Sequence, residues 1–216
     1  MIREFGTIDA LYLIAAIRWT LLLTLVGFVG GALIGIVIAV MRISGVIALQ
    51  AAALCYIQVI QGTPLLVLLF IFFFGLSIVG LPILPWVAAA TAFSLYTGAF
   101  LGEIWRGALQ SIPQTQWEAG GSLGLGFGEQ LRYVIVPQAV RIAIPPTVGF
   151  LVQLIKNTSL AATIGFVELT REGQLTTAAT YQPFTVYLVV AFLYFLMCFP
   201  LTQWSRILER RLHVAG

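Results

Sequence analysis

Long apolar segments dominate the pattern along this chain. A helix that crosses the hydrocarbon core of a bilayer needs about 20 consecutive apolar residues. Five segments reach that length, at residues 19–41, 53–79, 85–105, 138–156 and 184–205. The apolar runs are continuous and do not alternate every second residue, as membrane β-strands would. The pattern predicts an all-α membrane protein with five transmembrane helices in a single domain, residues 1–216.

Two of these segments contain residues that interrupt a helix. Gly62 and Pro64 lie in the first half of segment 53–79, so that helix could start later. Segment 138–156 contains Pro145 and Pro146. Proline removes a backbone donor and clashes with the preceding turn, so we expect a bend there.

Composition supports the membrane assignment. The chain is 60% hydrophobic and only 9% charged, with a net charge of +3. Soluble domains are roughly half apolar and about a quarter charged, so most of this surface must face lipid or other apolar helices. The positive charges are sparse and unclustered, which argues against nucleic acid as a partner.

The arginines predict how the chain is oriented, because cytoplasmic loops carry the excess of positive charge. One set of connections holds only Arg3, Arg18 and Arg171. The other set holds Arg42, Arg106, Arg132, Arg141, Arg206, Arg210 and Arg211. We therefore expect a multi-pass protein of the cytoplasmic (inner) membrane with its N-terminus outside and its C-terminus in the cytoplasm.

Small residues stand out in two places. Gly27, Gly31 and Gly35 share one face of the first segment, which favours close helix packing, with a hinge as the alternative. The second place follows Pro113, in a polar loop spanning about 106–136, where a short helix is expected to begin. Its glycine-rich continuation fits either a flexible loop or a helix end that docks on a partner through Trp117, Glu118 and Leu123.

The same loop resembles the EAA loop of ABC importer permeases. The matching residues, in the family's spacing, are Glu118-Ala119-Gly120, then Gly124, then Val134, Val136 and Pro137. Further stretches narrow the resemblance to the permeases of polar amino acid importers, which serve histidine, glutamate, glutamine, arginine and opines. These stretches are residues 62–66, 103–107, 137–141 and 156–160, and the resemblance covers about residues 18–205.

This resemblance implies a type I ABC importer permease fold and a set of partners. These are a dimer of ATPase subunits, a second permease of the same or a different kind, and an extracytoplasmic amino acid binding protein. It implies that the loop couples to the ATPase through Trp117, Glu118, Ala119, Gly120 and Gly124. The chain lacks the phosphate-binding loop of ATPases, so ATP and its magnesium are expected on the partner and no cofactor in this chain.

The composition is also compatible with two other function classes, an intramembrane protease and a transporter or channel driven by an ion gradient. An intramembrane protease needs a base, and the only histidine, His213, lies in the C-terminal tail. We therefore expect a transport subunit and not an enzyme. Composition alone leaves open a secondary transporter or channel subunit driven by an ion gradient.

Lys156 is the main candidate for contact with a substrate. At about 1.5 Å per residue from Arg141, it lies roughly 22 Å along its segment, and a charge at such depth needs a cavity or partners. A structural lysine paired with a carboxylate or with backbone carbonyls is the alternative. Neighbouring polar residues complete the candidate pathway: Gln61, Thr63, Gln153, Asn157, Thr158 and Ser159.

Two further expectations concern charge. Glu168, Arg171 and Glu172 predict either an outer gate or binding-protein contact, or a solvated loop. Asn157 stands where the resemblance would supply aspartate, and no other carboxylate lies deep in a segment. An unpaired buried charge is strongly disfavoured, so we expect a neutral or acidic amino acid as substrate.

Overall fold

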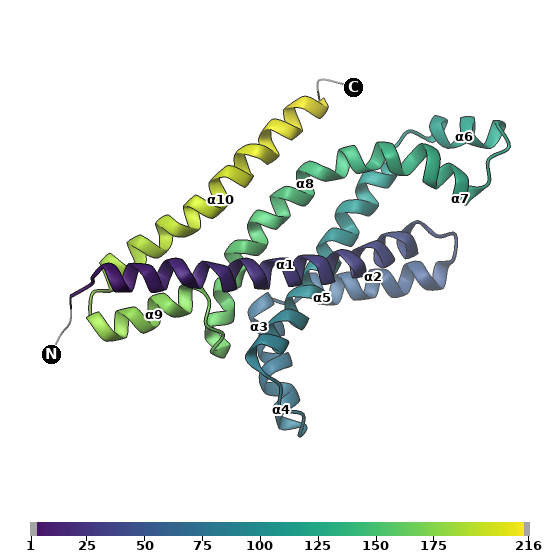
Figure 1. Cartoon of the computed structure of the whole chain (residues 1–216). Coiled ribbons are helices and arrows are strands. Elements are labelled where there is room, and N and C mark those ends of the chain that lie inside the picture. The colour runs from purple at the N-terminus through teal and green to yellow at the C-terminus, as the bar shows by residue number, and fades with distance from the viewer. Residues whose placement is uncertain (1–3, 214–216) are drawn as a thin grey trace.

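The computed structural model describes residues 4–213, and every regular element in that range is helical (Figure 1). The α-helices are α1 (Thr7–Ile43), α2 (Ile47–Gly62), α3 (Leu65–Phe70), α4 (Leu76–Ile78), α5 (Pro85–Gln110), α6 (Gln114–Ser122), α7 (Phe127–Gln130), α8 (Val136–Asn157), α9 (Leu169–Thr180) and α10 (Pro183–His213). Two π-helical turns, η1 (Ile71–Gly75) and η2 (Leu131–Ile135), and a 3₁₀ helix, η3 (Thr158–Ile164), connect neighbouring helices.

Membrane-spanning segments account for most of these helices. Within the described range, four helical stretches are long and apolar enough to cross a membrane: Thr7–Ile43, Pro85–Gln110, Phe127–Ile164 and Pro183–Arg210. A fifth is formed if α2 and the α3–α4 stretch are counted together, although they meet at an angle of 98°. The all-α membrane fold predicted from the sequence is confirmed, with its second span broken.

The break between α2 and α3 corrects the predicted span 53–79. α2 begins at Ile47 and ends at Gly62, and the chain turns sharply before α3. Thr63 between them is extended, with φ −106° and ψ 127°. This is the conformation that a following proline, here Pro64, imposes by steric clash.

The helices on either side of the loop predicted at 106–136 extend into it, so both are longer than predicted. α5 continues to Gln110, and helical structure resumes at Phe127, so only short connections flank α6. α7, η2 and α8 then form one curved run that continues through Pro145 and Pro146 without ending there (Figure 1). The search for apolar segments of about 20 residues did not include these helix ends because they carry polar residues.

Close packing of α1 on α5 forms the centre of the molecule. A β-carbon on Gly27 would come within 2.8 Å of Phe93 Cβ, and one on Gly35 within 3.0 Å of Leu101 Cβ. α5 also contributes a glycine to this contact, because a β-carbon on Gly98 would lie 2.5 Å from the Ile34 side chain. The predicted packing role of the α1 glycines is confirmed, because only bare backbone fits at this helix crossing.

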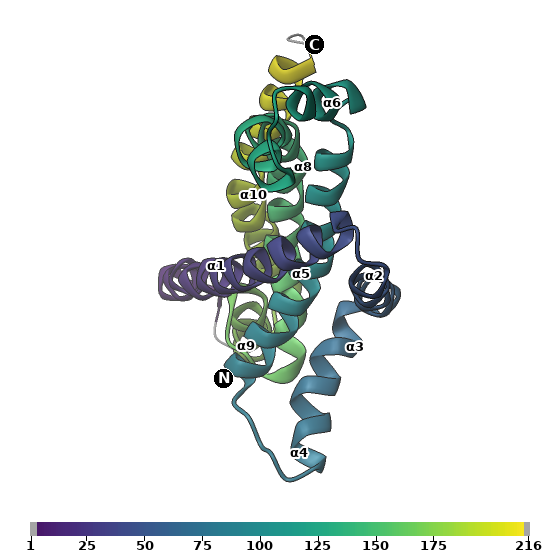
Figure 2. The same ribbon diagram turned by 90° about the vertical axis from the view of Figure 1, so that its right-hand side faces the viewer.

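The other long helices, α5, α8 and α10, follow a common direction, whereas α2 lies alongside α1 (Figure 1). α8 lies beside α10, and α9 lies against α1 (Figures 1 and 2). α6 and the end of α10 lie at one end of the molecule, whereas α4 and α9 lie toward the other (Figure 2). α1 crosses the other long helices at a steep angle (Figure 1).

Candidate functional site

α6 is a short helix whose two ends are defined by the sequence. Pro113 precedes it, and its carbonyl accepts the Gln116 amide at 2.9 Å. At the other end the Gly124 amide donates to the Gly121 carbonyl at 2.9 Å, and the Leu125 amide to the Gly120 carbonyl at 3.1 Å. This is a Schellman motif, and it places Gly124 in the left-handed region with φ +78°. Gly124 thus has a local role that the sequence pattern did not indicate.

The EAA-like residues of α6 divide between the inner and outer faces of the helix. Trp117 is partly buried and stacks on Phe127 with ring centroids 5.8 Å apart. Gly120 is buried, and a β-carbon there would lie 3.0 Å from Gln130 Cγ. Glu118 and Ala119 are exposed.

Trp117 is half-buried and packs within this chain, and its contact with an ATPase stays a prediction. Its indole holds α6 against α7, inside this chain. Leu123, which is 81% exposed, remains the outward apolar residue at this end of the protein.

A polar face lies on the last turns of α8. Gln153 and Lys156 are exposed, and Asn157 is partly exposed. The Gln153 amide group donates to the Asn157 side-chain oxygen at 3.1 Å, so these two side chains form one patch. Among the side chains of residues 4–210, no carboxylate forms an ion pair with Lys156, and its role stays a prediction.

The other pathway candidates do not join this face. Thr158 is fully buried and donates to the Ile155 carbonyl, and Ser159 donates to the Lys156 carbonyl, each at 2.7 Å. Gln61 donates to the Ala99 carbonyl of α5 at 3.4 Å, and Thr63 to the Val59 carbonyl at 2.7 Å. These hydrogen bonds are to backbone, and among residues 4–210 no side-chain hydrogen bond links these four residues to Lys156.

Glu168 corrects another expectation. It was predicted to lie in a gate or a solvated loop, yet its side chain is fully buried. It is the N-cap of α9, where its Oε1 accepts the Arg171 amide at 2.9 Å. Sequence reasoning missed this because α9 is too short and too polar to register as a span. The outer contacts expected of Arg171 and Glu172 remain a prediction.

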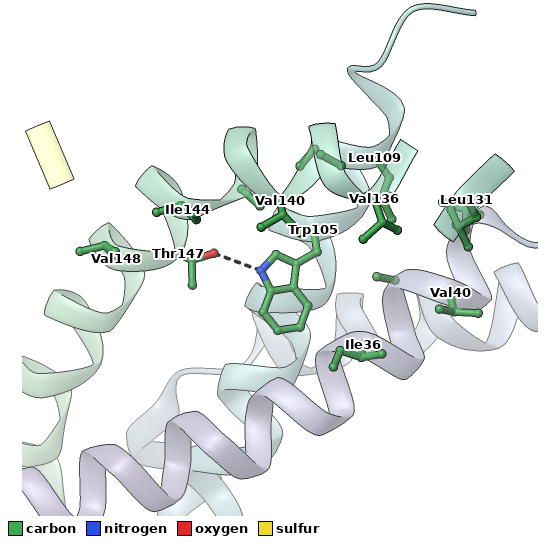
Figure 3. Close-up of a pocket in the computed structure, with 15 residues that line it drawn as sticks. Ile36, Val40, Trp105, Leu109, Leu131, Val136, Val140, Ile144, Thr147 and Val148 are labelled. Carbon is green, nitrogen blue, oxygen red and sulfur yellow. Dashed lines mark hydrogen bonds between the residues drawn. The ribbon is translucent and has the colours of Figure 1, made fainter. Parts of the chain in front are cut away.

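A cavity of about 570 Å³ opens between α1, α5 and α8 (Figure 3). Its lining is aliphatic apart from Trp105 and Thr147, and those two satisfy each other, since the indole Nε1 donates to the Thr147 hydroxyl at 3.0 Å. The lining offers no charged group to the ammonium or carboxylate of an amino acid. Nor does any cluster of three His, Cys, Asp or Glu residues suited to a metal occur in residues 4–213.

Known proteins resemble this chain over nearly its whole length. Residues 31–214 match the family described as "binding-protein-dependent transport system inner membrane component". The glutamine transport system permease protein GlnP of Escherichia coli strain K12 is 37% identical, covering 94% of this chain and 93% of that protein. The L-cystine transport system permease protein TcyB of Bacillus subtilis strain 168 is 39% identical, covering 91% and 84%.

Solved structures agree with this. A chain of the crystal structure of an amino acid ABC transporter with histidines has a TM-score of 0.87 at 34% identity, covering 93% of this chain and 94% of that one. A chain of the MetNI methionine ABC transporter shares the fold, with a TM-score of 0.73 at 21% identity, covering 94% and 99%. These relatives are ABC permeases and not ion-gradient transporters, which decides against that alternative. The chain therefore belongs to the family of binding-protein-dependent transport system inner membrane components, as a membrane-spanning permease subunit of an ABC importer.

Proposed function

We propose that this permease carries a neutral or acidic polar amino acid across the inner membrane along a path lined by Gln153, Lys156 and Asn157. The observation that carries the proposal is the exposure of Lys156, a cation without an ion pair in the described residues, on a helix that spans the membrane. A charge facing lipid at such depth costs about 3 kcal/mol. This face is therefore covered by a second permease, the same or different, with a polar path between the two.

Charge along this face favours one class of substrate. The patch formed by Gln153, Lys156 and Asn157 carries a cation and two amides. Glu103 pairs with Arg106 on α5, with Oε2 and Nε 2.9 Å apart, and Glu168 is buried against α9. A substrate carboxylate would thus meet Lys156, whereas a cationic side chain would find no carboxylate on this face among the described residues. The names of the relatives that transport glutamine and cystine support an amino acid as cargo.

α6 is the element that fits an ATPase partner. It lies at the same end of the molecule as the end of α10 (Figure 2), with Glu118 and Leu123 exposed. In this arrangement the C-terminus is cytoplasmic and the N-terminus is outside. ATP and magnesium bind to a dimer of ATPase subunits, whose closure moves α6. The permease pair then alternates between openings to the binding protein outside and to the cytoplasm.

Substrate competition tests the proposal. The permease is reconstituted with its ATPase, second permease and binding protein, and uptake of labelled glutamine, glutamate and arginine is compared. We expect glutamine or glutamate to be preferred, and Asn157→Asp to shift the uptake ratio toward arginine. Gln138→Glu, which adds the same charge at the other end of α8, should leave the ratio unchanged. Preference of the unmodified importer for arginine, with no acid supplied by the second permease, would contradict the proposal.

A further inference from the structure

The Glu168 carboxylate accepts hydrogen bonds from more donors than an N-cap requires. Its Oε1 already accepts the Arg171 amide at 2.9 Å and so caps α9. Its Oε2 accepts the Tyr194 hydroxyl of α10 at 2.8 Å and lies 3.5 Å from the Thr20 hydroxyl of α1. The shorter side chains of serine, threonine, aspartate and asparagine are the usual N-caps. Because the glutamate side chain is longer, its carboxylate contacts donors on three helices, α1, α9 and α10.

Thr20 closes this arrangement on the α1 side. Its hydroxyl accepts the Leu169 amide at 3.2 Å, so the first turn of α9 is held by α1 as well as by its own N-cap. Thr20, Glu168 and Leu169 are all fully buried. Buried polar groups that are satisfied in this way fix the geometry of the elements that carry them.

Tyr194 extends the connection to the polar face of α8. Its hydroxyl lies 3.1 Å from the Thr170 hydroxyl, and its ring packs against Val152 and Ile155 of α8. Thr158 is the first residue of η3, directly after Lys156 and Asn157, where the α-helix tightens into a 3₁₀ helix. The orientation of this turn sets the direction in which the preceding polar side chains point.

We infer that Glu168 is a positioning residue for transport, which acts through Tyr194 and its packing on Val152 and Ile155 to hold the last turn of α8, with Lys156 and Asn157, in its transporting orientation. The inference rests on the proposed pathway along α8. It assigns to this carboxylate an effect on substrate handling, in addition to its contribution to the stability of α9.

Kinetics of purified, reconstituted variants separate positioning from stability. Tyr194→Phe removes the hydroxyl bound to Glu168, Thr158→Val removes the hydroxyl bound to the Ile155 carbonyl at the end of α8, and Glu168→Ala removes the carboxylate. Thr177→Val is the matched control, because the Thr177 hydroxyl is buried on α9 with no partner in the described residues. For each variant the thermal midpoint, the apparent KM for uptake, the maximal rate and the glutamine-to-arginine uptake ratio are measured.

We expect Tyr194→Phe and Thr158→Val to change the apparent KM or the uptake ratio by about fivefold or more, with Thr177→Val like the unmodified protein. Glu168→Gln, which keeps one acceptor oxygen, should restore part of what Glu168→Ala loses. If all network variants lower only the thermal midpoint or the amount of folded protein, with KM and ratio unchanged, the inference is overturned.

A further variant separates failure of the inference from failure of the pathway. Lys156→Gln removes the cation without touching the network, and it should raise the apparent KM for glutamate. If it does so while Tyr194→Phe has no effect on KM or ratio, only the positioning role is wrong. If Lys156→Gln also leaves KM unchanged, the pathway along α8 is wrong, and the inference fails with it.

Discussion

Gly31 of α1 lies against Thr97 of α5 so closely that a β-carbon on the glycine would come within 2.3 Å of the Thr97 β-carbon. Both residues are buried. Their contact is the tightest point of the crossing on which the other helices are built.

Gly31→Ala should therefore destabilise the permease. The nearest atom, Thr97 Cβ, is attached directly to the backbone of α5 and cannot rotate away. We therefore expect the free energy of unfolding to fall by about 1–3 kcal/mol, as is typical of overpacking. Gly107→Ala on α5 is the control, since a β-carbon there meets nothing within 4 Å and alanine favours a helix. Thermal unfolding of the two variants in detergent measures the difference. Equal midpoints would show that the crossing is looser than described.

Changes at Gly124 should impair coupling while the membrane part stays folded. Its φ of +78° costs a residue with a β-carbon about 1–2 kcal/mol at the end of α6. Gly124→Asp should lower transport and the stimulation of ATP hydrolysis by the binding protein. Gly124→Asn has the same shape without the charge, and Gly128→Ala adds a methyl group where nothing lies within 4 Å. Normal transport by Gly124→Asp would refute a coupling role for this helix end.

Reporter fusions test the orientation. Because arginine-rich connections stay in the cytoplasm, a reporter placed after residue 216 or within residues 114–130 should be cytoplasmic. A reporter between Gly80 and Pro85 should be external. The reverse result would show that the arginine bias was misread.

Glu168 should give the stability of the protein a pH dependence. Burial raises the pKa of its carboxyl above the ordinary value, against the opposing effect of its amide and hydroxyl donors. The folded state then holds the proton more tightly than the unfolded state. The contribution to stability is complete below the unfolded pKa, about 4.3, and is lost as the pH rises through the folded pKa.

Glu168→Gln isolates this effect, because it cannot ionise. We expect the thermal midpoint of the unmodified protein to fall relative to that of Glu168→Gln as the pH is raised from about 4. A difference between the two that does not change with pH would show that the carboxyl has an ordinary pKa in the folded protein.

Hydropathy predicted that the long helices exist because their signal is local to each segment, but it placed the first at residues 19–41, whereas α1 begins at Thr7. The glycine face of α1 was predicted for the same reason, since its spacing lies within one helix. The start of α6 at Gln114 also followed from its own neighbours, namely Pro113 and the polar residues after it. The 98° turn after α2 was only partly foreseen, as an interruption at Gly62 and Pro64.

Features that depend on distant residues were missed. Glu168 appears in the sequence as an ordinary loop carboxylate, because its partners Thr20 and Tyr194 are far away along the chain. The stacking of Trp117 on Phe127 was also missed, because nothing in the segment around Trp117 indicates it. The left-handed conformation of Gly124 depends on hydrogen bonds back to α6, which glycine content alone does not reveal.

The length of α1 has a consequence for the surrounding bilayer. Its 37 residues extend about 55 Å, whereas the hydrocarbon core is about 30 Å thick. To keep its exposed apolar side chains, among them Leu11, Leu25 and Leu33, out of water, the helix must lie strongly tilted. Because α1 is fixed to α5 by the glycine contacts, its tilt is shared with the rest of the fold. Thickening or thinning of the membrane therefore acts as a torque on the helix crossing.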